Sequence, residues 1–297
     1  MRQALLRWFR RAGRSDLPWR RERSPYRTLV SEFMLQQTQV DRVVPIFTAF
    51  VERFPTLTAL AAASCGEILR AWRGLGYNAR ALRLHAAAAA VVAEHRGRLP
   101  RATSALLALP GIGPYTAAAI RAFGYDIDDV PLDVNLKRVL HRVFWGPEDP
   151  AAATSTQLAT LAFALMPRGR AHDWNSALMD FGATICTSRA PKCAICPLRG
   201  ACAAAALLGA STVERTRRTR RTRRKAVAFV LTSRYARGRI VDRLRDLPPG
   251  KRISLLDLHR DLKAVLADRR IAEVRELVRA LHGEGLVVLQ DGSVSLP

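Results

Sequence analysis

Four cysteines in the second half of the chain are spaced closely enough to surround one metal centre. Cys186, Cys193, Cys196 and Cys202 follow the pattern C-x6-C-x2-C-x5-C. A structural zinc site usually pairs two short knuckles, and this pattern contains only one x2 pair. Iron–sulfur clusters are held by four thiolates at uneven spacings, often with a proline after one ligand, and Pro197 follows Cys196. The spacing favours a 4Fe–4S cluster, with zinc or free thiols as the alternatives.

Two carboxyl groups stand in sequence settings that suit acid–base chemistry. Glu32 lies in "VSEFMLQQ", where apolar neighbours would remove it from water and raise its pKa. A carboxyl with such a pKa can donate a proton near neutral pH. Asp133, in "PLDVN", precedes a helical pattern, where an aspartate is most simply an N-cap. The residues alone leave both capping and catalysis open for Asp133.

A glycine loop leads straight into an alanine-rich helical pattern in "LPGIGPYTAAAI", residues 109–120. Such a loop lets backbone N–H groups approach a phosphate, and a helix N-terminus adds its positive dipole. The backbone N–H groups of Gly111, Ile112 and Gly113 could therefore bind a phosphate, a contact that would not read base sequence. Taken alone, a Gly-x-Gly tripeptide is also an ordinary tight turn.

The charge of the chain indicates a polyanionic partner. The 297 residues include 48 Lys and Arg against 25 Asp and Glu, a net charge of +23. A nucleic acid fits this surplus, because each neutralised phosphate releases counterions. A membrane surface is the weaker alternative, since it would call for a basic amphipathic helix with bulky aromatics. Residues 215–225, "RTRRTRRTRRK", have no apolar position and predict a solvated linker that can also bind phosphates.

The segments that must position these residues are helical before the arginine run. "SEFMLQQTQVDRVVPIFTAFVERF", "CGEILRAWRGLGY" and "ALRLHAAAAAVVAEH" place apolar residues three and four apart, as in amphipathic helices. Pro and Gly pairs between them mark helix ends. No β-alternation precedes residue 226, no apolar run is long enough to span a membrane, and no signal peptide is expected.

Residues 226–297 have a different pattern. "VAFVLTS" predicts a strand, and "LVVLQDGSVSL" predicts a hairpin around Asp291-Gly292. Helical patterns lie between them at about 237–247, 254–266 and 268–283. Three helices followed by a hairpin suggest a small α+β winged-helix-like domain, a type that often lies on DNA. A module for packing or dimerisation is the alternative.

Six motifs and the cysteine loop, in this order, resemble a known family. The motifs are "LPWR" (17–20), "SEFMLQQTQV" (31–40), "GLGY" (74–77), "LPGIGPYT" (109–116), "LDVNLKRVLHRV" (132–143) and "ALMDFGATIC" (177–186). They resemble the MutY-type adenine DNA glycosylases of the helix-hairpin-helix superfamily, to which endonuclease III also belongs. The resemblance covers roughly residues 5–205. The hairpin and the cysteine spacing are shared across the superfamily, whereas "MLQQTQV" points to MutY.

The resemblance implies an all-α helix-hairpin-helix glycosylase fold, with two helical subdomains, a DNA-binding cleft and a C-terminal loop that holds a 4Fe–4S cluster. Two departures stand out. Asn78 replaces the second aromatic of the usual "GLGYY", and the last residues do not match the Nudix-like domain common in the family. The expected domains are a glycosylase domain at 1–205 (barrel subdomain 21–125, cluster subdomain 1–20 plus 126–205), a linker at 206–225 and the winged-helix-like domain at 226–297.

The resemblance also implies catalytic roles. Glu32 would protonate N7 of a flipped adenine, and Asp133 would stabilise the cationic sugar or form a covalent adduct with it, much as paired carboxyls do in glycoside hydrolysis. Asn135 would orient Asp133 or the attacking water. Tyr115 stands where bifunctional members carry a Schiff-base lysine, and a phenol cannot do that chemistry. Base removal without strand cleavage is therefore expected, even if Tyr115 also packs beneath the hairpin.

Other positions match residues that contact the substrate. A base in duplex DNA must be extruded before it reacts, and Gln37 and Tyr77 match residues that wedge into the duplex near the lesion pair. The adenine pocket wall would include Leu35, with Asp180 as a polar support. The expected substrate- and DNA-contacting set is Trp19, Arg20, Leu35, Gln36, Gln37, Thr38, Tyr77, Gly111, Ile112, Gly113 and Asp180.

These assignments predict a monofunctional enzyme of base excision repair that removes adenine mispaired with 8-oxoguanine or guanine in double-stranded DNA. A thymine or uracil mismatch glycosylase of the same superfamily is the alternative enzyme. A non-catalytic iron–sulfur DNA binder or redox sensor is the alternative of another class, although a pure binder would not need a carboxyl in an apolar setting. We expect a cytoplasmic, nucleoid-associated bacterial protein that is a monomer and has no membrane partner.

Overall fold

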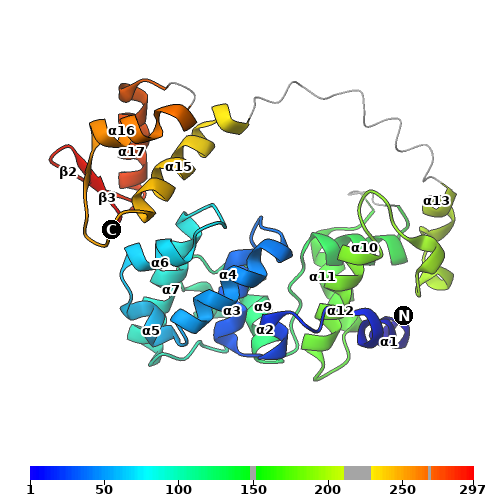
Figure 1. Cartoon of the computed structure of the whole chain (residues 1–297). Helices are drawn as coiled ribbons and strands as arrows, with labels where there is room; N and C mark the ends of the chain where they lie inside the picture. The colour runs from blue at the N-terminus through cyan, green and yellow to red at the C-terminus, as the bar shows by residue number, and fades with distance from the viewer. Residues whose placement is uncertain (148–151, 211–228, 267–268) are drawn as a thin grey trace. The chain divides into compact units, whose positions relative to one another are not determined.

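The computed structural model describes residues 1–147, 152–210, 229–266 and 269–297. The chain forms two compact units (Figure 1). The first unit contains Met1–Glu32, Arg101–Ala108 and Ile112–Arg223. The second contains Phe33–Pro100, Leu109–Gly111 and Arg224–Pro297. The chain therefore passes repeatedly from one unit to the other.

The described residues of the first unit form helices joined by turns and loops, without a strand. Its elements are α1 (Arg2–Ala12), α2 (Pro18–Arg21), α3 (Pro25–Leu35), α8 (Thr103–Leu107), α9 (Pro114–Ala119), η1 (Ile120–Gly124), α10 (Val134–Phe144), α11 (Ser155–Leu165), α12 (Ala171–Thr184), η2 (Cys193–Ile195), η3 (Arg199–Ala201) and α13 (Ala205–Ala210). The last three residues of α3 belong to the second unit.

The core of the first unit forms where α1 and α10 pack against α12. Leu5 of α1 is buried among the apolar face of α12, which includes Trp174 and Phe181. The ring of Trp8 meets that of Phe181 edge-on at 5.3 Å, a favourable geometry for aromatic pairs. Burial of these large side chains holds α1 against α12, which lies far from it in the sequence.

The expected helical hairpin is present between α8 and α9. Gly111, in the turn, has φ +74°, a left-handed backbone that glycine adopts without steric cost. Pro114 occupies the first position of α9, where its missing N–H would have had no partner in the helix anyway. The sequence prediction of a glycine turn that opens a helix is confirmed.

The second unit begins with a group of helices around an aromatic core. They are α4 (Val40–Arg53), α5 (Leu57–Ala62), α6 (Cys65–Ala71) and α7 (Ala79–His95). Phe50 and Trp72 are fully buried, with ring centroids 6.0 Å apart. Helix α6 starts at a capping box, in which Ser64 and Glu67 each bond to the other's backbone N–H. Such boxes satisfy N–H groups that a helix start leaves without partners.

The C-terminal part of the second unit combines helices with a small sheet. Its elements are η4 (Phe229–Leu231), α15 (Ser233–Arg245), β1 (Ile253–Ser254), α16 (Leu255–Leu262), η5 (Lys263–Val265), α17 (Ile271–Gly283), β2 (Val288–Gln290) and β3 (Ser293–Ser295). The antiparallel strands lie in the order β1-β3-β2. Asp291 and Gly292 have φ of 50° and 71°, as a two-residue hairpin turn requires.

The predicted helical fold with a small C-terminal sheet is confirmed, and so are the three C-terminal helices and the hairpin. The strand predicted at "VAFVLTS" is wrong: Phe229–Leu231 form a 3-10 turn, and Thr232 caps α15 by accepting from the N–H of Tyr235. The arginine run at 215–225 lies outside the described residues. The domain boundaries stay predictions. Among the described helices, none is long and apolar enough to cross a membrane.

Candidate active site

Glu32 projects from α3 into a buried setting. Only 8% of the residue is exposed. Burial raises the pKa of Glu32 to about 7, and the nearby Asp133 carboxylate adds to this, whereas hydrogen bonding from Tyr115 and the charge of Arg20 oppose it. The Tyr115 pKa is itself raised well above its usual value by burial and by both carboxylates, so the phenol keeps its proton and can donate it to Glu32.

Asp133 lies just before α10 and caps it. Its Oδ1 accepts from the N–H of Leu136 at 2.7 Å, and its Oδ2 accepts from Asn135 Nδ2 at 2.7 Å. Burial raises the pKa of Asp133 above its ordinary value, while these hydrogen bonds and Arg138 restrain the rise. Capping therefore takes place, and it fixes the carboxylate close to Glu32, which feels its charge.

Arg138 supports this arrangement, and the sequence analysis missed it. Its guanidinium donates to Asn135 Oδ1 at 2.8 Å, to the carbonyl of Gly182 at 2.7 Å and to that of Cys186 at 2.8 Å. One side chain thus connects the amide beside Asp133 to the start of the cysteine loop. Gly182 is required by close packing, because a Cβ there would lie 2.7 Å from the Cβ of Asn135. No local sequence signal pointed to Arg138.

With the roles that the resemblance implies for Glu32 and Asp133, the two carboxyls predict a bell-shaped dependence of base release on pH. Glu32 must be protonated to act as an acid, so the rate should fall as pH rises through about 7, approaching tenfold per pH unit. Asp133 must be ionised, so the rate should also fall at low pH, below a pKa that lies above the ordinary aspartate value. Single-turnover rates from pH 4.5 to 9 measure both limbs. A flat profile across pH 6–8 would contradict the assignment of Glu32.

A fully buried carboxylate, Asp180, anchors the residues expected at the pocket wall. Its oxygens accept from Arg20 at 2.6 Å and from Arg14 at 2.5 Å. Burial by itself would raise the pKa of Asp180, but the hydrogen bonds and charges of these arginines outweigh it and hold the pKa below its usual value. The ion pairs fix Arg20 and the rest of α2, including the partly exposed Trp19. Arg14 was not predicted from the sequence.

In the second unit, Arg80 holds two loops that carry expected DNA contacts. The buried guanidinium donates to the carbonyls of Phe33 and Met34 at 2.9 Å each and to that of Gln36. It also donates to Thr38 Oγ1 at 3.1 Å and to the carbonyls of Leu75 and Gly76 at 3.2 Å each. Burial lowers the pKa of Arg80 to about 10, so it remains charged at neutral pH.

The two residues expected to wedge into DNA have left-handed backbones in these loops. Gln37 has φ 55° and Tyr77 has φ 45°, conformations that cost non-glycine residues free energy unless the surroundings impose them. Both side chains are exposed, and Tyr77 retains 39% of its surface. Arg80 donates to the carbonyls of Gln36 and Gly76, the residues immediately before these two, and such bonds stabilise the loops in which they lie.

Replacing Arg80 by methionine should therefore destabilise the protein. The change leaves buried carbonyls without donors, so we expect a loss of about 3 kcal/mol in the free energy of unfolding. Denaturant titration measures the loss. Arg83→Met, one turn along α7 and exposed, is the matched control and should change stability by less than about 0.5 kcal/mol. Equal effects of the two changes would show that Arg80 does not act through these bonds.

The two glycines of the hairpin, Gly111 and Gly113, differ in whether the structure requires glycine at that position. Gly111 has both a left-handed backbone and little room, since a Cβ would lie 3.0 Å from that of Arg83. Gly113 has an extended backbone, and a Cβ there would meet nothing within 4 Å. Ile112, between them, is 5% exposed and serves as a packing residue. Their expected role at a phosphate remains a prediction.

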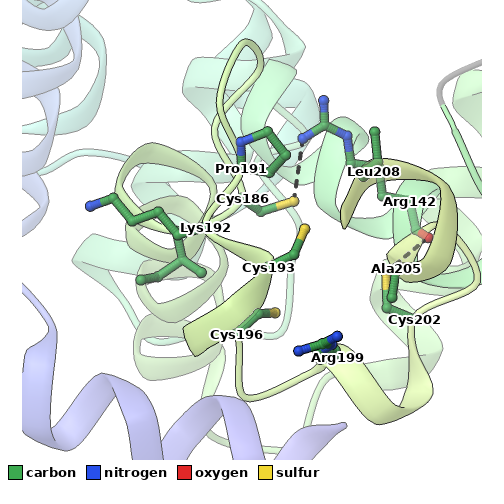
Figure 2. Close-up of a pocket in the computed structure, with 11 residues that line it drawn as sticks. Arg142, Cys186, Pro191, Lys192, Cys193, Cys196, Arg199, Cys202, Ala205 and Leu208 are labelled. Atoms are coloured by element: carbon green, nitrogen blue, oxygen red, sulfur yellow. Dashed lines mark hydrogen bonds between the residues drawn. The ribbon is translucent and has the colours of Figure 1, made fainter. Parts of the chain in front are cut away.

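The four cysteines of the loop line one pocket with a basic wall (Figure 2). Arg142, which is fully buried, points Nη1 at Cys186 Sγ, 3.6 Å away, and also donates to loop carbonyls. Burial raises the pKa of Cys196 to about 11, and the other three thiols of the loop contribute. Among the described residues, no group of three or more His, Cys, Asp or Glu side chains is placed closely enough to hold one metal ion.

Comparison with known proteins identifies the family of this chain. Residues 30–162 match the HhH-GPD superfamily of base excision DNA repair proteins. An adenine DNA glycosylase of Mycolicibacterium smegmatis is 42% identical over 291 residues, covering 95% of this chain and 96% of its own. The chain belongs to the adenine DNA glycosylase family. A match over 95% of this chain includes most of residues 226–297. The human adenine DNA glycosylase is 42% identical over 68% of this chain and 39% of its own length.

Solved structures agree with this fold. A thermostable thymine-DNA glycosylase matches with a TM-score of 0.64 and 32% identity, over 69% of this chain and 95% of that one. An endonuclease III–DNA covalent intermediate matches with a TM-score of 0.60 and 19% identity, over 69% of this chain and 94% of that one. The helix-hairpin-helix glycosylase fold predicted for this adenine DNA glycosylase family member is thus confirmed.

Proposed function

We propose that the protein is a monofunctional DNA glycosylase that removes adenine mispaired with 8-oxoguanine or guanine. The observation that supports this proposal most directly is the pair of carboxyls. Glu32 is buried and can be protonated near neutral pH, and Asp133 beside it is held at the N-terminus of α10. Relatives named adenine DNA glycosylases, 38–42% identical over most of the chain, support the choice of adenine. The substrate is double-stranded DNA, with the base flipped out of the duplex before the bond breaks.

The proposed reaction divides the work between the two carboxyls. Glu32 donates its proton to N7 of adenine, and the C1′–N9 bond breaks with its electrons going to the base. Asp133 stays ionised and stabilises the positive charge that develops on the sugar, either as an ion pair or through a covalent adduct. Water then attacks C1′, breaking the bond to Asp133 where an adduct has formed, gives its proton to the Glu32 carboxylate and leaves an abasic site.

The neighbours of these carboxyls have supporting roles. Tyr115 donates to Glu32 and orients it. Asn135, fixed by Arg138, orients Asp133 or the attacking water. Because Tyr115 carries no amine, no Schiff base forms, and the strand is not cut.

The remaining contacts hold the substrate. Gln37 and Tyr77, in loops braced by Arg80, fill the space left by the flipped base. In the first unit, the α2 residues Trp19 and Arg20, which Asp180 anchors, contact the excised base. In the second unit, Leu35 is the proposed contact to that base. The hairpin residues Gly111, Ile112 and Gly113 bind a DNA phosphate, and Gln36 and Thr38 belong to the same set of substrate and DNA contacts.

The cysteine loop suits a 4Fe–4S cluster. Cys186, Cys193, Cys196 and Cys202 line one pocket and would hold the four irons, while Arg142 offsets the negative charge of the thiolates. When bound, the cluster supplies four iron–thiolate bonds that tie the loop into one rigid structure. The purified protein should be brown, and metal and sulfide analysis should find four irons and four sulfides per chain. One zinc per chain would contradict the proposal.

A thymine or uracil mismatch glycosylase is the second candidate. It is favoured by the 32% identity to a thymine-DNA glycosylase across nearly that whole chain, whereas the adenine relatives are more similar and cover more of this chain. We place the protein in the cytoplasm on chromosomal DNA, because that is where its substrate lies, and as a monomer.

Single-turnover base release on four duplexes tests the proposal. These pair adenine with 8-oxoguanine, adenine with guanine, thymine with guanine, and uracil with guanine, each read with and without alkali. Alkali-dependent cleavage of the adenine strands is expected, because alkali cuts only at abasic sites. Release of thymine or uracil alone supports the second candidate, and tight binding without release supports a non-catalytic binder.

A further inference from the structure

The C-terminal domain, here residues 229–297 of the second unit, packs against α6 and against Asn78, just before α7, through Arg245. This side chain is only 2% exposed. It donates to the carbonyl of Leu69, in the last turn of α6, at 2.8 Å and to Asn78 Oδ1 at 2.8 Å. Its Nη1 bonds to Asp242 at 2.7 Å, so the buried charge is paired. Asn78 is the position where the family carries an aromatic, and here its amide oxygen receives this guanidinium.

Further contacts extend the same interface. Arg73 pairs with Asp246 at 2.5 Å, and Arg70 donates to the carbonyl of Leu247 at 3.1 Å. The chain end is also held, since a Cβ on Gly66 would lie 2.6 Å from the carbonyl oxygen of Pro297. These contacts fix the orientation of α15 relative to the "GLGYN" loop within the second unit.

Docking places Arg234 of α15 over Tyr77. The guanidinium carbon lies 4.0 Å from the centre of the Tyr77 ring and 5.9 Å from that of Phe229. Phe229 in turn packs edge-on against Tyr235 at 5.5 Å. Both Arg234 and Phe229 are exposed. A guanidinium can stack on an unpaired base or hydrogen-bond to it, and an aromatic ring can stack on one.

Arg234 differs from the other arginines of its helix. Each of the others forms an ion pair with an aspartate or glutamate, namely Arg237, Arg239, Arg243 and Arg245. Within the described ranges, Arg234 has no carboxylate partner. Its donors are therefore available to a ligand that carries acceptors, such as O6 of guanine or 8-oxoguanine.

We propose that Arg234 binds the purine opposite the excised adenine and thereby lets the C-terminal domain contribute to opposite-base selectivity. The proposal rests on the proposed function, which places Tyr77 at the lesion pair. Because Arg234 lies directly on Tyr77, a duplex opened at that ring brings the base opposite the flipped adenine within reach of the guanidinium.

The test compares duplex affinity and base release for the full-length protein and Arg234→Ala. The base opposite adenine is 8-oxoguanine, guanine or a tetrahydrofuran residue, which has no base. Arg234→Ala should weaken binding to the two purine duplexes by about 10- to 100-fold and leave the tetrahydrofuran duplex unchanged. Arg237→Ala, on the same helix but paired with Glu284, is the control and should change none of the three. Unaltered circular dichroism verifies that both variants are folded.

Two results would overturn the proposal. Equal weakening on all three duplexes, with a salt slope reduced by about one, would identify a phosphate contact instead. No change with any duplex would show that Arg234 does not meet the DNA. Repeating the binding in a Glu32→Gln background needs no base release, so opposite-base recognition remains measurable even if adenine turns out not to be the excised base.

Discussion

Glu32→Gln should lower adenine release by a factor of about 100 to 10,000, the contribution typical of a positioned general acid. Glutamine keeps the size and hydrogen-bonding capacity of the side chain but has no proton to give to N7. The variant should bind mismatched duplex as tightly as the parent and keep the same cluster absorbance. Single-turnover release and duplex affinity, measured on one preparation, separate the two effects. Adenine release at the parental rate would eliminate the proposed mechanism.

The same Glu32→Gln variant, although less active, should be more stable than the parent at high pH. The pKa of Glu32 rises from about 4.5 to about 7 on folding, so the folded state retains a proton that the unfolded state loses as pH increases between these values. Stability of the parent therefore falls with rising pH across that window, by about 3 kcal/mol at pH 8. The glutamine side chain does not titrate, so the Glu32→Gln variant should be the more stable protein at pH 8. Denaturant titrations at pH 5 and pH 8 measure this difference.

Asp133→Asn should lower base release by about 100- to 1,000-fold, because the developing positive charge on the sugar loses its counter-ion. Asparagine is as good an N-cap as aspartate, and it can still accept from the Leu136 N–H that Asp133 now bonds. The free energy of unfolding should therefore change by less than about 0.5 kcal/mol. Charge and capping are thus separated by one substitution.

Asp133→Ala is the contrasting variant. It removes the cap as well as the charge, and should cost about 1 kcal/mol of stability in addition to the activity. Circular dichroism with denaturant follows the stability, and single-turnover release follows the activity. If the asparagine variant retained most of the activity, Asp133 would be a structural cap and nothing more.

Much of the candidate site could be predicted because the properties of its residues depend on their neighbours in the sequence. Glu32 sits among apolar neighbours, and burial is indeed the largest influence on its pKa. Asp133 precedes a helix and caps it. The four cysteines lie close in the sequence and line one pocket. The helices before residue 205 have apolar periodicity, and their expected fold is confirmed.

The residues that sequence analysis missed act over long distances. Arg14 bonds to Asp180, 166 residues away. Arg80 and Arg138 have partners three to five residues away, but also others at 42–47 and 44–48 residues. Nothing near each arginine indicates which distant carbonyl or carboxylate it meets. The strand predicted at "VAFVLTS" was wrong for a related reason. Its apolar residues suit a strand, but a strand needs a neighbouring strand, and the described sheet contains only β1, β3 and β2.

The bonds from Arg14 to Asp180 close a loop of 166 residues, which has a consequence for synthesis on the ribosome. The helices α4 to α7 make contacts close in sequence and can form as they emerge. Helix α1 must wait until α12 has been translated before its apolar face is covered, and long-range contacts of this kind form slowly. The N-terminal segment is therefore the part of the nascent chain that we expect to depend longest on chaperones.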